Sequence, residues 1–216
     1  MNYFQYKRML RHLCVFFFSF VFICYAQETK LSQSEIEELK SNVSATAQKS
    51  KTIVNSFTQL KHIDFLSNDI ESSGDLYFKA PNIIKWSYTK PYDYSVIFKD
   101  KKLYINDSGK KSDVNLASNK VFKKLNDLIA KSVSGDMLDE NQFSMNFYKN
   151  TLGYIAKLSP NDPTLQKMFN QIILTFDIEV FLVSQVKLVE SSGDYTLINF
   201  KNKSVNQPIS DAVFAH

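Results

Sequence analysis

The chain has 216 residues and a formal net charge of +4, and 44% of its residues are hydrophobic and 14% aromatic. This length suffices for one domain with a sizeable core. The excess of positive charge lies at the N-terminus, because subtracting Lys7, Arg8 and Arg11 from the 26 basic residues leaves 23 against 22 acidic ones. The near-neutral remainder argues against nucleic acid or a strongly anionic surface as the partner.

The N-terminal segment has the composition of an export signal. Its three basic residues precede an apolar run from Leu13 to Ala26. This run has the length typical of a signal peptide and falls short of the about 20 residues that span a membrane. Residues 1–26 are therefore predicted to be a signal peptide cleaved after Ala26, with an uncleaved anchor as the alternative. Cleavage before Cys24, as in a lipoprotein, is disfavoured by the bulky Ile23 that precedes it.

Residues with typical catalytic chemistry are scarce beyond this segment. Both cysteines, Cys14 and Cys24, lie within it, so the exported chain forms no disulfides and depends on its core for stability. The remaining histidines are His62 and His216, and there is no Gly-x-Ser-x-Gly motif and no histidine spacing typical of a metal site. The sequence therefore predicts no enzyme, no metal and no other cofactor.

A helix followed by strands is predicted for the first half of the exported chain. Ser32 and Glu35 form a capping-box pattern, and apolar residues continue at helical spacing to about Lys49. From Lys51 the period changes to two, and we expect one long or broken strand that ends at a turn at 72–74. Short strands are then expected at 75–79, 83–88, 94–99, 102–106 and 112–116.

The pattern changes again near the middle of the chain. Residues 119–135 show helical spacing, with an apolar face opposite a lysine-rich one. A short helical turn is expected at 161–169, and the tail 206–214 is expected to cap the sheet. Further strands are expected at 143–149, 153–160, 171–178, 180–190 and 194–202. The sequence thus predicts about eleven strands within a single domain, residues 27–216.

The number of strands bears on whether the protein encloses a cavity. A sheet of about eleven strands seldom stays flat, because it curls or splits into two sheets. Barrels of eight strands can already hold a small ligand. A mainly β fold with a curled antiparallel sheet is therefore one prediction, with the 119–135 helix against its open side. A two-sheet sandwich with a packed core is the alternative, since its strands would show the same apolar faces.

The most regular alternation lies in residues 74–92, GDLYFKAPNIIKWSYTKPY. One face of the strands in this region carries the side chains predicted to line a cavity, which are Leu76, Phe78, Ile84, Trp86, Tyr88, Val96 and Phe98. The apolar face of the 119–135 helix carries the residues predicted to form a lid, which are Val121, Leu125, Leu128 and Ile129. Both sets have ordinary core packing as their alternative, since aromatic strand faces are usually core.

The 74–92 stretch resembles a block of the outer-membrane lipoprotein carrier protein family (LolA-like). SFTQLK at 56–61, VIFKDKKLYIND at 96–107 and INFKNKSVNQPISDAVF at 198–214 resemble further segments of that family. The likeness covers about residues 35–214. It implies an incomplete antiparallel β-barrel with a helical lid over an apolar cavity. It also implies a monomeric carrier that shelters the acyl chains of lipoproteins in the periplasm.

The resemblance also implies partners and a lid latch. The partners are an inner-membrane releasing complex and an outer-membrane acceptor. The latch is an arginine before the proline of the block, but Ala80 stands there, and alternation directs Lys79 to the opposite face. This departure leaves open another lipid-like cargo, such as a glycolipid or an acylated pigment. A third alternative is a structural protein of the envelope with a solid core.

Overall fold

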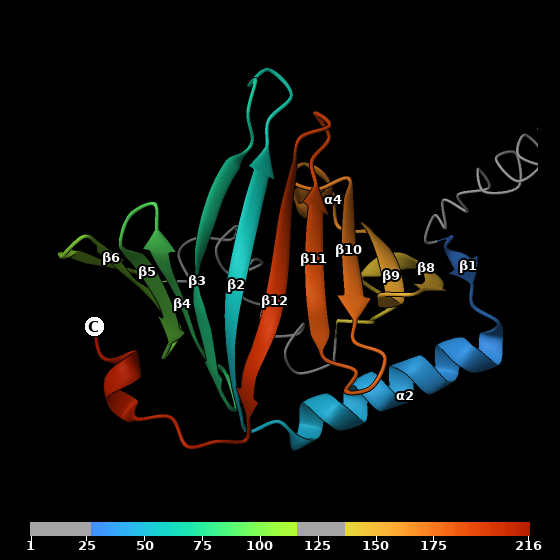
Figure 1. Cartoon of the computed structure of the whole chain (residues 1–216), viewed down its shortest axis with the longest axis horizontal. Coiled ribbons are helices and arrows are strands. Elements are labelled where there is room, and N and C mark those ends of the chain that lie inside the picture. Colours follow the sequence, from blue (N-terminus) through green and yellow to red (C-terminus); the bar gives the residue numbers. More distant parts are fainter. Residues whose placement is uncertain (1–26, 116–136) are drawn as a thin grey trace, which may run out of the picture.

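Twelve strands form one continuous antiparallel sheet in the computed structural model, which describes residues 27–115 and 137–216 (Figure 1). The order across the sheet is β1-β8-β9-β10-β11-β12-β2-β3-β4-β5-β6-β7. Consecutive strands are mostly neighbours, as expected for a meander, and the pair β12–β2 joins the two halves. The strands are β1 (Thr29–Lys30), β2 (Thr52–His62), β3 (Ile70–Lys79), β4 (Ile83–Lys90), β5 (Tyr94–Lys99), β6 (Lys102–Asp107), β7 (Lys110–Asn115), β8 (Phe143–Asn150), β9 (Gly153–Pro160), β10 (Gln171–Phe176), β11 (Val183–Val189) and β12 (Tyr195–Val205).

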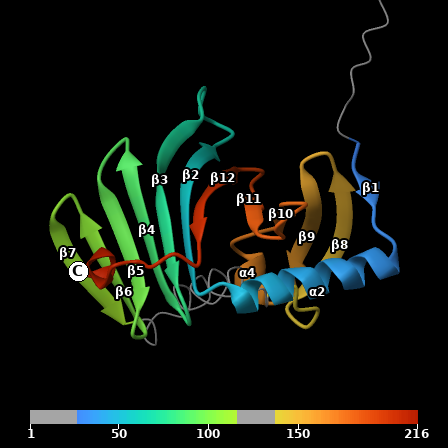
Figure 2. The same ribbon diagram turned by 60° about the horizontal axis from the view of Figure 1, so that its bottom comes forward.

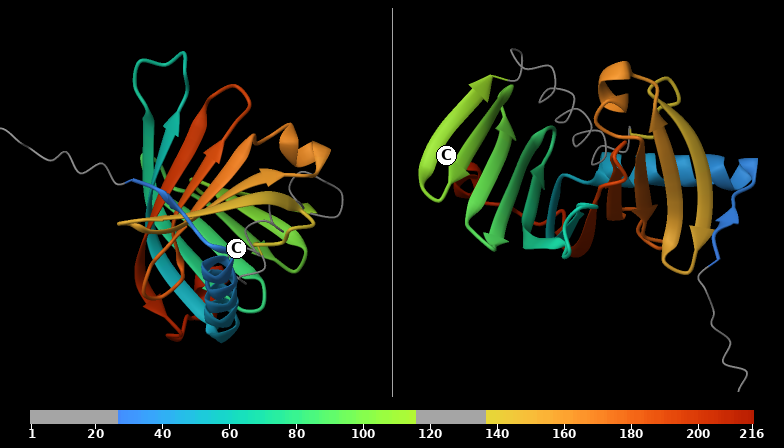
Figure 3. Two further views of the ribbon diagram at one scale, coloured as in Figure 1. Left: turned by 90° about the vertical axis from the view of Figure 1, so that its right-hand side faces the viewer. Right: turned by 90° about the horizontal axis from the view of Figure 1, so that it is seen from above.

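The sheet is curled and open. Its edge strands β1 and β7 are not paired with each other, and Figures 2 and 3 show the sheet bending around one concave face. The prediction of an incomplete antiparallel β-barrel of about eleven strands is therefore confirmed. The two-sheet sandwich is wrong, because all twelve described strands belong to the same sheet.

The predicted N-terminal helix is present as α2, Gln33–Lys49. Its start is fixed by the predicted capping box, in which the Ser32 backbone N–H donates to Glu35 Oε2 at 2.8 Å and the Ser32 hydroxyl accepts from the Glu35 backbone. Lys149 of β8 pairs with Glu35 at 2.5 Å and, together with the Ser32 bonds, lowers the pKa of Glu35 to about 2. The start of α2 is thus tied to the sheet.

Two apolar clusters lie on the concave face, one on each half of the sheet. Leu39 and Val43 of α2 pack against buried side chains of β8, β9 and β10 in the first cluster, and Figure 2 shows α2 crossing this half. The second cluster lies on β2 to β6, where its buried residues are Ile53, Leu76, Phe78, Ile84, Phe98 and Leu103. The concave face is therefore apolar across both halves, and α2 covers only one of them.

The C-terminal segment covers part of the other face, as predicted for a cap. It contains the 3₁₀ helix η2 (Asp211–Phe214), and the Phe214 side chain is only 4% exposed. Lys79 pairs with Asp211 at 2.5 Å, and the Lys85 amine donates to the Val213 carbonyl at 3.0 Å. Alternation along β3 and β4 places both lysines opposite the cavity-facing side chains. The predicted helical turn is also present, as α4 (Pro163–Gln166).

The turn predicted at 72–74 is wrong. These residues lie inside β3, and the chain reverses earlier, between the end of β2 at His62 and Ile70. Gly74 allows the backbones of β3 and β4 to approach closely where their register shifts. A Cβ at this position would lie 1.9 Å from the Ser87 carbonyl oxygen of β4. The same letters, SSGD, at 191–194 do form a turn, with Gly193 at φ +100°. The same four-residue sequence therefore lies within a strand at one place in this chain and forms a turn at another.

Two predicted segments lie outside the described residues. They are the signal peptide, residues 1–26, and the helix that carries Val121, Leu125, Leu128 and Ile129. Across 27–115 and 137–216, no helix combines the length and apolar character needed to cross a membrane.

We predict that Gly74→Ala destabilises the fold. The added methyl group would overlap the Ser87 carbonyl, and overpacking of this kind costs about 1–3 kcal/mol of unfolding free energy. Chemical denaturation of the variant measures this loss. Ser73→Ala, at the adjacent and partly exposed position, should change stability by less than about 0.5 kcal/mol. Equal stability of the two variants would contradict the close approach of β3 and β4.

Candidate functional site: an apolar cavity between the two halves of the sheet

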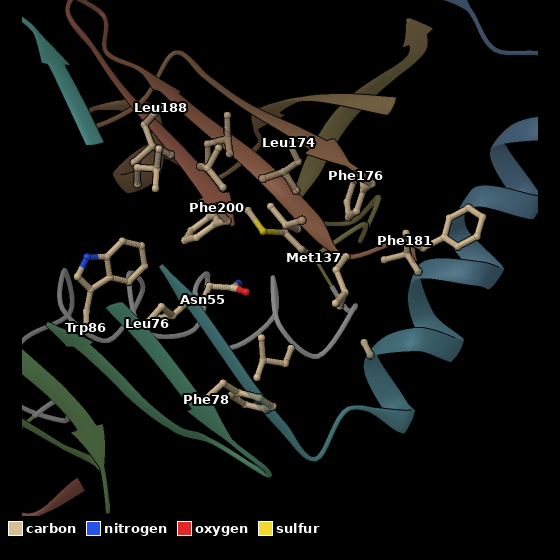
Figure 4. Close-up of a pocket in the computed structure, with 18 of the residues that line it drawn as sticks. Asn55, Leu76, Phe78, Trp86, Met137, Leu174, Phe176, Phe181, Leu188 and Phe200 are labelled. Carbon is tan, nitrogen blue, oxygen red and sulfur yellow. The ribbon is translucent and has the colours of Figure 1, made fainter. Parts of the chain in front are cut away.

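A cavity of about 200 Å³ lies on the concave face between the two apolar clusters (Figure 4). Nearly all of its lining is apolar, and among the described lining residues none is titratable. The lining residues are Val43, Ala47, Ile53, Asn55, Leu76, Phe78, Trp86, Met137, Phe169, Ile172, Leu174, Phe176, Phe181, Leu182, Val183, Val186, Leu188, Ile198 and Phe200.

The lining follows from the local periodicity of each element. Val43 and Ala47 are four residues apart, so both face the same way from α2. On β2, β3, β10 and β12 the lining residues alternate along the strand, as Leu174 and Phe176 do on β10. On β11 the register shift opposite Phe176 interrupts this alternation between Val183 and Val186. The sheet order then brings β10, β11 and β12 beside β2 and β3, so that side chains from both halves meet around one space.

The structure places the seven predicted cavity residues in two groups. Leu76, Phe78 and Trp86 line the cavity. Ile84, Val96 and Phe98 lie on the same face and in the same cluster but are not part of the cavity lining. Ile84 is the cross-strand partner of Phe78, Val96 that of Trp86, and Phe98 that of Ile84. Alternation identifies the shared face, whereas the curl of the sheet decides which part of that face borders the cavity.

Tyr88, the seventh residue, forms part of an aromatic group beside the cavity. Its ring meets Phe57 edge-on at 5.1 Å between centroids, and its hydroxyl donates to Gln59 Oε1 at 3.0 Å. Burial raises the pKa of the Tyr88 hydroxyl, against the opposing effect of hydrogen bonding. The centroid of the Trp86 ring lies 4.8 Å from that of Phe57 and 5.8 Å from that of Phe200. Trp86 thus connects the aromatic group to the cavity wall.

Most of the lining was not identified from the sequence. The missing members come from α2, from β2, from β10 to β12 and from connecting segments, the last being Met137, Phe169, Phe181 and Leu182. The strand periodicity of β10 to β12 was visible, but only the pairing of β12 with β2 places these strands around the same space as Leu76 and Trp86. The sequence indicated Asn55 only weakly, because it is a polar residue on the strand face that also carries Ile53 and Phe57.

Across the described ranges, three or more His, Cys, Asp or Glu side chains never gather in a way that could hold a metal ion. The cavity itself offers apolar surface, the Asn55 amide and the indole N–H of Trp86, so it can shelter an apolar ligand, and no described lining side chain is an acid, a base or a nucleophile. The fold and this site define a class of protein: an open, curled antiparallel β-barrel with an internal apolar cavity and a helix across part of its concave face.

Comparisons with known proteins agree with this class. The model of the family "Outer membrane lipoprotein carrier protein LolA" matches residues 48–216, and the chain belongs to this family. An outer-membrane lipoprotein carrier protein of Pseudomonas putida (strain GB-1) is 26% identical over 168 residues, covering 77% of this chain and 78% of that protein. One from Nitrosospira multiformis is 23% identical over 146 residues, covering 66% and 67%.

Solved structures match this chain at low sequence identity. An uncharacterized conserved protein from Thermus thermophilus matches with a TM-score of 0.50 and 10% identity, covering 83% of this chain and 92% of that one. A LolA superfamily protein from Nitrosomonas europaea matches with a TM-score of 0.43 and 7% identity, covering 83% and 97%.

We predict that Val186→Trp blocks the cavity. Val186 lines the cavity from β11, so the indole ring of a tryptophan there would occupy the space that an apolar ligand needs. Titration with an uncharged fluorescent apolar probe should show at least about tenfold weaker binding, about 1.4 kcal/mol. Val189→Trp, on the opposite face of the same strand, should bind the probe like the unmodified protein. Equal binding by both variants would show that the probe binds elsewhere.

Proposed function

We propose that this protein is a periplasmic carrier that shelters the acyl chains of lipoproteins on their way to the outer membrane. The single observation that carries the proposal is an apolar cavity, without titratable groups in its described lining, in a chain of the lipoprotein carrier family. The proposed mature protein is one carrier domain, residues 27–216, released by cleavage after Ala26. It acts by binding, not by catalysis.

The energetics of sheltering support a site of this kind. Each acyl CH₂ group removed from water contributes about 0.8 kcal/mol, so a carrier needs apolar area and no reactive groups. The cavity of about 200 Å³ exceeds the about 150 Å³ of dry apolar cavities that bind benzene. In this conformation it accommodates a short length of chain. A longer chain needs more room, and separation of α2 from the sheet would widen the wall that Val43 and Ala47 form.

Loading and release both follow from burial. Buried apolar area by itself only tightens binding, so release requires handover to a second apolar site. We therefore propose that the protein receives its cargo from an inner-membrane releasing complex and passes it to an outer-membrane acceptor. This role is consistent with a monomer that binds first the releasing complex and then the acceptor.

A second candidate cargo is favoured by one observation at the family's latch position. Ala80 has no side chain that could hydrogen-bond to a lid, and the neighbouring Lys79 is engaged with Asp211 on the other face. A carrier without the usual latch could serve another lipid-like molecule, such as a glycolipid or an acylated pigment.

Trp86 provides the test, because it is the protein's one tryptophan and it lines the cavity. Titration of the purified protein with a fatty acid or an acylated peptide should change Trp86 emission in a saturable way. Absence of both lipid uptake and any Trp86 response would refute the carrier function. Lipid binding that acylated peptides fail to compete would favour the second cargo class.

We predict that Trp86→Glu weakens lipid uptake more than it lowers stability. A carboxylate in the apolar wall is costly to bury against an acyl chain, so affinity should fall at least about tenfold, about 1.4 kcal/mol. Binding is measured by displacement of a fluorescent probe and stability by denaturation. Tyr77→Glu makes a similar change on the opposite face of β3 and should leave affinity intact. Parallel losses of affinity and stability in Trp86→Glu would mean that Trp86 is only core.

A further inference from the structure

Asn55 is the one amide among the described residues of the cavity lining, where the only other hydrogen-bonding side-chain group is the indole N–H of Trp86, a donor. It lies on β2 with its residue only 6% exposed, between the apolar Ile53 and Phe57 on the same strand face, and opposite Leu76 of β3. Figure 4 shows the amide directed into the space between the two halves of the sheet. Among the side chains that the structure describes, Asn55 Oδ1 and the indole Nε1 of Trp86 are buried with no hydrogen-bond partner, and Asn55 Oδ1 is the acceptor of the two.

A buried amide oxygen without a partner is unfavourable. Removing it from water breaks its hydrogen bonds to solvent, and no described side chain donates a hydrogen bond in their place. A leucine, which has the same number of side-chain heavy atoms in the same branched shape, would avoid the penalty. Buried polar groups in folded proteins almost always have partners, so an exception that faces a cavity indicates that the partner comes with the ligand.

We propose that Asn55 hydrogen-bonds to a donor carried by the ligand inside the cavity. The donor is a hydroxyl or an amide N–H attached to an otherwise apolar chain, since the unpaired atom is an acceptor. The inference rests on the proposed function, that the cavity binds acyl chains, and adds a chemical preference to it. A hydroxylated or amide-bearing acyl chain is the preferred ligand, and an unsubstituted chain is the poorer one.

The chemistry of the wall excludes a carboxylate as the group beside Asn55. An anionic headgroup would face the amide oxygen in a wall whose described members carry no cation, and an unpaired buried charge is costlier than an unpaired amide. The charged end of a fatty acid therefore stays outside. The group recognised at Asn55 is neutral and lies along the chain.

Matched ligand pairs test this preference in the unmodified protein. One pair is a fatty acid and its 3-hydroxy derivative of equal length, and the other is a fatty amide with an N–H and its N,N-dimethyl derivative. Competition against a fluorescent apolar probe measures the affinities. The donor-bearing member of at least one pair should bind about threefold to tenfold more tightly. The pair that shows the difference distinguishes a hydroxyl from an amide donor.

Two variants assign the preference to the amide. Asn55→Leu should abolish it while binding the plain chain at least as tightly as before. Ile53→Val, on the same face of β2, keeps the amide and should retain the preference even if both affinities fall. Thermal unfolding verifies that each variant is folded, and if Asn55→Leu does not fold, the ligand pairs in the unmodified protein decide.

The outcomes separate this inference from the proposed function. Equal affinity within both pairs, or a preference that survives Asn55→Leu, overturns the role of Asn55 and leaves the carrier function standing. Binding of none of the four ligands overturns both. A preference for the donor-bearing chain that is lost only in Asn55→Leu establishes the inference.

Discussion

The pairing of β12 with β2 holds the two halves of the sheet together. The two strands are antiparallel from Tyr195 opposite His62 to Val205 opposite Ile53, with one irregularity between Asn202 and Ser204. Because β2 begins one half and β12 ends the other, this pair closes the longest loop of the sheet, and its formation is entropically the most demanding step. Without it, the two apolar clusters would not face a common space and there would be no shared cavity.

The position of the cavity follows from this constraint. Each half has its own cluster of buried side chains, and α2 covers only the half formed by β8 to β10. The space between the clusters is bordered by Ile198 and Phe200 of β12 and by Ile53 of β2, the strands of the central pair. A closed and fully packed barrel would fill this space with its own side chains, whereas an open curled sheet leaves room for a guest.

Sequence periodicity was sufficient for local features of the molecule. It predicted the capping box at Ser32, the strand face shared by Leu76 and Trp86, and the orientation of Lys79 away from that face. It failed where the outcome depends on distant segments. Ser72–Gly74 has the composition of a turn, and only the close passage of the Ser87 carbonyl explains a glycine within β3. The contributions of β10, β11 and α2 to the cavity likewise depend on tertiary packing that no local pattern encodes.

The wall of the cavity has the chemistry of a carrier that must both hold and release. Apolar lining binds without directional bonds, so cargo can leave whenever a comparable apolar surface is offered. The proposed hydrogen bond to Asn55 would add one directional contact to this wall, whereas Ala80 offers no hydrogen-bonding side chain at the expected latch position. Selectivity in this chain would therefore come from within the cavity, while opening of the cavity would depend on other contacts, such as the ion pair of Lys149 with Glu35 at the start of α2.

Native mass spectrometry of the protein isolated from its own envelope tests the central claim most directly. The account predicts a population whose mass exceeds that of the polypeptide by one acylated molecule, and release of that molecule on gentle activation. Detection of the bare polypeptide alone, under conditions in which an established lipid carrier keeps its lipid, would contradict the claim that the cavity carries lipid in the cell.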